Sequence, residues 1–103
     1  GQACVIRQGT VIASEDDAGT DAMLGRLGAT AKAAILFKGP KPNQDRRADL
    51  PVIGPRTVAN AAAAGLAGIV IEADGVMVPD LAGVIEVLDA QGMFLWVRSK
   101  EAA

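Results

Sequence analysis

The stretch TVANAAAAGLAGIVIE, residues 57 to 72, decides the fold class of this chain. Its first half predicts a helix that begins at Thr57. Gly65 is expected to end this helix, because glycine adopts the left-handed turn that other residues resist. The following AGIVIE, residues 67 to 72, is a short apolar run typical of a buried strand. A helix followed at once by a buried strand is the unit from which α/β domains are built.

The N-terminal part predicts two strands, a helix and a further strand. Residues 3 to 14, ACVIRQGTVIAS, predict a hairpin around Gln8-Gly9. Thr20 is the expected N-cap of a helix to about residue 28, whose apolar residues follow helical spacing. The run AAILF, residues 33 to 37, is fully apolar and suits a central strand that is covered on both faces.

The C-terminal part continues the alternation. Asp74-Gly75 predicts a turn into a short VMV strand, Asp80 is the expected cap of a third helix that Gly92 closes, and MFLWV is a last strand. The order predicts one α/β domain over residues 1–103, in two or three layers, with a mixed or largely parallel sheet. About three helices are expected, near residues 20–28, 57–64 and 80–91.

Composition excludes several classes of site. A chain of 103 residues is the size of one domain, and its net charge of −2 predicts no strong attraction to nucleic acid. Because the sequence contains no histidine, imidazole catalysis and imidazole metal ligation are excluded. Cys4 is the only cysteine, which excludes an internal disulfide and a cysteine zinc site, and we expect it to be a buried core thiol.

A proline-rich stretch between residues 38 and 56 gathers charge. Four prolines argue against a regular helix or a central strand here, and long loops in compact domains are often functional. Its cations, followed by the helix start at Thr57, are suited to binding phosphate, and its carboxylates to holding a divalent cation or orienting water. The alternative is a solvated loop whose charges pair with each other. The charged residues are Lys38, Lys41, Asp45, Arg46, Arg47, Asp49 and Arg56.

A second candidate is Gly19-Thr20-Asp21, at the start of the first predicted helix. A helix N-terminus with a hydroxyl and a carboxylate could form part of a site, and Glu15 lies just upstream. Simple helix capping explains the same residues without any function. No phosphate loop of the GxxxxGK type and no GxGxxG motif is present.

Three motifs together resemble the C-terminal domain of the LpxI-type UDP-2,3-diacylglucosamine pyrophosphatases. The first is Glu15 followed by GTDAML, the second is KPNQDRRADLPVIGPRTV, residues 41 to 58, after Lys38, and the third is AAAAGLAGI, residues 61 to 69. The resemblance covers essentially the whole chain. Family members also carry an N-terminal domain, and the start at Gly1 instead of a methionine leads us to expect that this sequence is a fragment of a longer protein.

The resemblance implies an activity and its requirements. Such enzymes hydrolyse the pyrophosphate of UDP-2,3-diacylglucosamine in lipid A biosynthesis, which releases UMP and lipid X. They require a divalent metal, usually Mg²⁺, and hold the substrate between two domains. The essential aspartate of the family motif falls on Asp45, and Asp45 and Asp49 are the candidate metal ligands. The matching substrate- or phosphate-binding positions are Thr20, Asp21, Lys38, Lys41, Gln44 and Arg47, to which the helix start adds Thr57.

One departure and two alternatives accompany this expectation. Many relatives have glutamate where this chain has Ala18, which removes one acidic group near Gly19. The first alternative is a module that binds phosphate or a nucleotide sugar but is inactive on its own. The second is a structural or oligomerisation domain, with a homodimer formed at an exposed strand edge. If the chain is part of such an enzyme, we expect a cytoplasmic location with peripheral association at the inner membrane.

Overall fold

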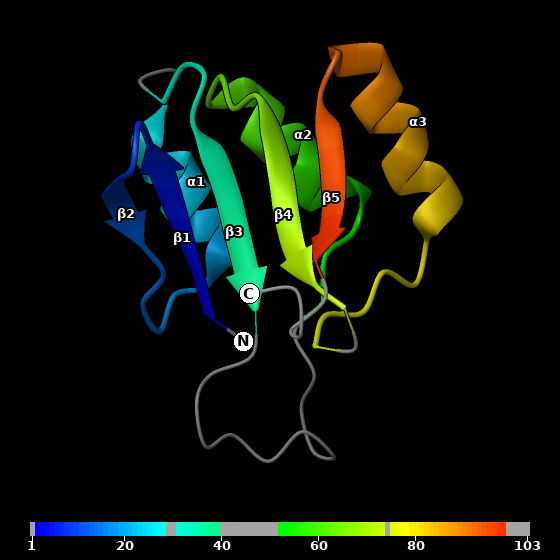
Figure 1. Cartoon of the computed structure of the whole chain (residues 1–103), viewed down its shortest axis with the longest axis horizontal. Coiled ribbons are helices and arrows are strands. Elements are labelled where there is room, and N and C mark those ends of the chain that lie inside the picture. The colour runs from blue at the N-terminus through cyan, green and yellow to red at the C-terminus, as the bar shows by residue number, and fades with distance from the viewer. Residues whose placement is uncertain (1, 29–30, 40–51, 74, 99–103) are drawn as a thin grey trace.

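The computed structural model describes residues 2–28, 31–39, 52–73 and 75–98 of the chain (Figure 1). Its elements are β1 (Gln2–Arg7), β2 (Thr10–Ser14), α1 (Thr20–Leu27), β3 (Ile35–Gly39), α2 (Pro55–Ala63), β4 (Gly68–Glu72), α3 (Leu81–Gln91) and β5 (Phe94–Arg98). The predicted alternation of helices and strands is therefore confirmed. α1 begins at residue 20 as expected, and α3 begins one residue later than expected. α2 begins two residues earlier, at Pro55, whose fixed φ and missing N–H suit a first helical turn.

The strands form one mixed sheet with the order β2-β1-β3-β4-β5. β1 is antiparallel to both β2 and β3, whereas β3, β4 and β5 are mutually parallel neighbours. The hairpin of β1 and β2 turns where it was predicted, because Gln8 and Gly9 have positive φ values of 53° and 79°. Two-residue hairpin turns favour that left-handed conformation, since it matches the twist of the strands.

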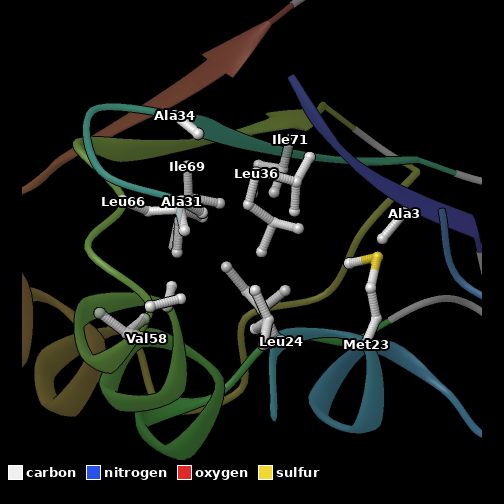
Figure 2. Packing of buried hydrophobic residues seen from close by; sticks show 14 of the residues in the cluster. Ala3, Met23, Leu24, Ala31, Ala34, Leu36, Val58, Leu66, Ile69 and Ile71 are labelled. Carbon is white, nitrogen blue, oxygen red and sulfur yellow. The ribbon is translucent and has the colours of Figure 1, made fainter. Parts of the chain in front are cut away.

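The hydrophobic core lies between the sheet and a single layer of three helices. Figure 2 shows Leu36 of β3 and Ile69 of β4 pointing from the sheet toward Leu24 of α1 and Val58 of α2. All four side chains are almost completely buried. The domain therefore has two layers, whereas the sequence left two or three layers open.

The opposite face of the sheet has no helix over it within the described residues. The expectation that the strand near residues 33–37 is covered on both faces is wrong, because Ile35 and Phe37 are only half-buried. Cys4, which is paired with Phe37 across β1 and β3, lies on this open face and is likewise half-buried instead of a core thiol. Phe94 and Trp96 of β5 are 44% and 57% exposed. An apolar run gives no information about which of its two faces a helix layer will cover.

The predicted VMV strand does not form. Among the described residues this segment makes one isolated bridge, between Met77 and Val52, and the Met77 carbonyl accepts a hydrogen bond from the Ile53 N–H at 3.0 Å. Pro79 follows directly and leads into α3, so the segment has no room to extend as a strand. Its contribution is to anchor the chain just before α2.

The N-terminus of α3 has the cap that the sequence predicted. The Asp80 carboxylate accepts a hydrogen bond from the Gly83 N–H at 3.0 Å, and Gly92 ends the helix in the left-handed conformation. We expect Asp80→Ala to lower the free energy of unfolding by about 0.5–2 kcal/mol, because one N–H of the first turn loses its acceptor. Glu86→Ala, in the exposed middle of the same helix, is the matched control. Equal midpoints of chemical denaturation for the two variants would show that the cap contributes nothing.

Candidate functional site at the carboxyl edge of the sheet

One edge of the sheet collects the features that the sequence singled out. The carboxyl ends of β3, β4 and β5 meet at the lower edge in Figure 1, and α2 and α3 begin on the same side. β2 runs in the same direction as β3, so α1, which follows β2, also begins there. Open α/β sheets bind ligands at such an edge, because loops and helix N-termini converge on it.

Lys38 lies at this edge, one residue before the end of β3. Its side chain points into the protein and is only 8% exposed. The ammonium donates hydrogen bonds to the Thr20 hydroxyl at 2.9 Å and to the Val52 carbonyl at 3.0 Å. The Thr20 hydroxyl in turn donates to the Glu15 carboxylate. We call Glu15, Thr20, Lys38 and the Val52 carbonyl the Lys38 cluster.

Thr20 differs from its predicted role. Gly19, with a φ of 96°, is the N-cap of α1, and Thr20 is the first helical residue. The Thr20 hydroxyl cannot cap the helix because it is bonded sideways to Glu15 and Lys38. Spacing along the sequence cannot distinguish a capping hydroxyl from one that a distant lysine holds, and this is the reason that the N-cap prediction was wrong.

The charge of Lys38 is balanced within the protein. Burial lowers the pKa of the Lys38 ammonium, and the carboxylates of Glu15 and Asp21 oppose that shift. Burial is the larger effect, so the folded-state pKa lies below the ordinary 10.5. Two acceptors and two nearby carboxylates together explain how a charged group remains in a largely buried position.

This shift predicts a pH dependence of stability. Between the lowered pKa of the folded state and the ordinary pKa of the unfolded state, the unfolded chain binds more protons at Lys38. The contribution of Lys38 to the free energy of unfolding therefore rises with pH in that window. We expect wild type to gain stability relative to Lys38→Met as the pH rises toward the ordinary lysine pKa of 10.5. Urea denaturation of both proteins across the range measures this, and a difference that shrinks as pH rises would contradict the assignment.

Asp21 and Thr57 occupy two other positions near the edge. Asp21 is exposed in the first turn of α1, and its carboxylate accepts a hydrogen bond from the Asn60 amide of α2 at 3.1 Å. Thr57 is 7% exposed in the first turn of α2. Sequence reasoning missed Asn60, whose one distinguishing signal was an amide within a run of alanines. The Asp21–Asn60 bond links the first turn of α1 to the middle of α2.

The predicted site is brought together in part. Thr20 and Lys38 are in direct contact, and Asp21 is close enough to act on the charge of Lys38. The remaining predicted residues, Lys41, Gln44, Asp45, Arg47 and Asp49, lie outside the described residues. The parts of the chain that the structure describes contain no group of three cysteine or carboxylate side chains able to hold a metal ion. The roles of the five predicted residues outside the described parts, including metal binding by Asp45 and Asp49, remain predictions.

Comparison with known proteins shows the family to which this chain belongs. The family model described as the LpxI C-terminal domain matches residues 1–96, from β1 into β5. The chain belongs to the LpxI C-terminal domain family. A protein of Caulobacter vibrioides, named UDP-2,3-diacylglucosamine pyrophosphatase LpxI, is 44% identical to this chain over 104 residues. That similarity covers 92% of this chain and 37% of the Caulobacter protein.

The LpxI resemblance expected from the motifs is thus confirmed at the level of the family. The matched residues include all three helices and the whole Lys38 cluster. Because this LpxI C-terminal domain spans little more than a third of the relative, the activity of the relative is not carried over directly. No helix within the described ranges is long and apolar enough to cross a bilayer.

Proposed function

We propose that this chain is the C-terminal half of a two-domain enzyme that hydrolyses the pyrophosphate of UDP-2,3-diacylglucosamine to UMP and lipid X. The single observation that carries the proposal is the match to the LpxI C-terminal domain over residues 1–96, with a 44% identical relative named for that activity. The Lys38 cluster adds physical support, because it is a set of hydrogen-bonded polar groups at the sheet edge where α/β domains bind ligands. The product pair places this role in lipid A biosynthesis.

The proposed chemistry rests on residues of two kinds. Asp45 orients the attacking water or a metal, and the side chains of Lys41, Gln44 and Arg47 bind the phosphate oxygens. Asp21 and Thr57 lie near the same edge, in the first turns of α1 and α2. Mg²⁺ is the proposed cofactor, since Asp45 and Asp49 offer the oxygen donors that it prefers, and when bound it would offset the charge of the pyrophosphate.

The proposed partners follow from the size of the substrate. A UDP group and two acyl chains form two large ends, and an N-terminal domain of the same enzyme would hold one of them. The remaining length of the Caulobacter relative, of which this chain covers 37%, supports such a second domain. Because the substrate is a lipid, we propose a cytoplasmic enzyme that works at the surface of the inner membrane.

Measuring UMP release with the chain alone and with the two-domain enzyme tests this proposal. The chain alone is expected to turn over UDP-2,3-diacylglucosamine far more slowly, because a bound substrate must be oriented from both ends before it reacts. Equal rates would contradict the two-domain proposal. Titration of the chain with UDP-2,3-diacylglucosamine separates the two alternatives, since a binding module would bind without turnover and a structural domain would not bind.

A further inference from the structure

Lys38, which is 8% exposed, is the one buried charged residue among the described parts of the chain. A buried ammonium is costly unless its protons have acceptors, so the protein maintains this position only through the contacts around it. Within the described residues, the acceptors of those protons are the Thr20 hydroxyl and the Val52 carbonyl. The next question is which parts of the chain these two bonds join.

The bonds join segments that are far apart in the sequence. Lys38 lies two residues before the stretch 40–51, and Val52 follows that stretch directly, so the Lys38–Val52 bond connects the residues on its two sides. The Lys38–Thr20 bond connects both to the first residue of α1. Thr20 continues the connection to Glu15, whose N–H is bonded to the Ala3 carbonyl of β1 at 2.8 Å. One ammonium therefore links the end of β3, the start of α1 and Val52.

The far side of this connection is itself held in place. Ile53, next to Val52, is completely buried, and its N–H is bonded to the Met77 carbonyl. The Val52 carbonyl that Lys38 binds is therefore next to a residue that is fixed in the core. This arrangement is suited to setting the relative positions of β3, α1 and the residues that lead into α2.

The surroundings of Lys38 argue against direct contact with phosphate. Lys38 is 8% exposed, and both of its acceptors among the described residues are protein atoms. Glu15 and Asp21 lie close enough to influence its pKa, so their negative charge offsets the positive charge that an anion would need. A lysine that binds phosphate acts as an accessible point charge, and Lys38 is not accessible in this way.

We propose that Lys38 is a positioning residue, which fastens the residues flanking the stretch 40–51 to the start of α1 and does not itself bind phosphate. This assignment replaces the phosphate-binding role expected from the sequence, and its kinetic consequence rests on the proposed function. Asp45 and the proposed phosphate-binding side chains lie within the flanked stretch, so loss of the fastening would disturb the orientation of the reacting groups as well as the binding of substrate.

Kinetics of four variants of the two-domain enzyme test this proposal, at a temperature where each variant is fully folded. Lys38→Met is expected to lower kcat by roughly tenfold to a hundredfold, as misplacement of reacting groups does, and to raise KM by a smaller factor. Thr20→Val, which removes one acceptor, should lower kcat in the same direction. Thr20→Ser keeps the hydroxyl and should restore the wild-type rate. Lys32→Met removes an exposed lysine and is the matched control.

Hydrogen exchange gives a second measurement that needs no turnover. In Lys38→Met and in Thr20→Val, amides of residues 15–23 should exchange faster than in wild type, and in Lys38→Met so should those of residues 52–58. Amides of β5, which has no contact with the Lys38 cluster in the described bonds, should exchange at the wild-type rate. Loss of fastening opens the structure locally, whereas loss of general stability raises exchange everywhere.

Three results would overturn the proposal. A rise in KM with kcat unchanged would make Lys38 a substrate contact, and unchanged exchange near Thr20 and Val52 would show that it fastens nothing. If Lys38→Met fails to fold, wild-type kinetics and wild-type exchange in Thr20→Val would overturn it instead. Absence of turnover in wild type would defeat the proposed function and not this fastening, because the exchange measurement still decides whether Lys38 holds these segments.

Discussion

Replacing Asp45 by alanine in the two-domain enzyme is expected to remove nearly all UMP release while the melting temperature and the substrate affinity stay close to wild type. The proposed task of Asp45 is to orient water or metal, and losing such a group costs on the order of a hundredfold or more in rate. A carboxylate in a stretch that contains three prolines within residues 40–51 has little part in the core, so the fold should survive. Asp45→Asn should behave similarly, because it keeps the size and removes the charge.

Arg47→Ala is the comparison that gives this result its meaning. A cation that meets phosphate acts in the ground state and in the transition state, so its loss should weaken substrate binding as well as rate. Melting, substrate binding and UMP release are measured side by side for the three variants. A fully active Asp45→Ala would remove Asp45 from the mechanism and leave this stretch as a binding surface.

Replacing Leu36 by alanine is expected to have the largest effect on stability, a loss of about 2–5 kcal/mol in the free energy of unfolding. Leu36 is completely buried in β3, between β1 and β4, and Figure 2 shows it in the cluster with Leu24 and Ile71. Truncation both loses apolar burial and leaves a cavity that the sheet cannot close. Small domains have only about 5–15 kcal/mol of stability, so the variant should be close to its limit.

Val11→Ala is the matched control for this prediction. Val11 lies in the edge strand β2 and is 55% exposed, so its truncation should change stability by about 0.5 kcal/mol or less. Urea denaturation of the 103-residue chain gives the midpoint and slope for both variants. Equal losses for Leu36→Ala and Val11→Ala would contradict the assignment of the core to the helix-covered face.

Local signals predicted the elements of this fold well. Gln8-Gly9, Gly65 and Gly92 mark turns where positive φ is required, and each has it in the structure. Asp80 caps α3, because the side chain of an aspartate just before a helix can accept a hydrogen bond from the N–H three residues later. These features depend on residues close together in the sequence, which is why sequence reasoning found them.

Features that depend on distant residues were beyond sequence reasoning. Whether Ile35 and Phe37 face a second helix layer depends on which side α2 and α3 cross, and alternation within β3 does not decide it. The Lys38–Thr20 bond spans 18 residues, and no spacing rule places a strand-end lysine against a helix start. The motifs nevertheless named both residues as part of one site. What they did not indicate was that Lys38 would be buried.

The proposed hydrolysis is tested by identifying the products that the two-domain enzyme forms from UDP-2,3-diacylglucosamine. Mass spectrometry of the reaction, with Asp45→Ala as the parallel control, identifies the bond that is cleaved. We expect equal amounts of UMP and lipid X from wild type and almost none from the control. Release of UDP with the free sugar lipid, or equal product from wild type and Asp45→Ala, would contradict it.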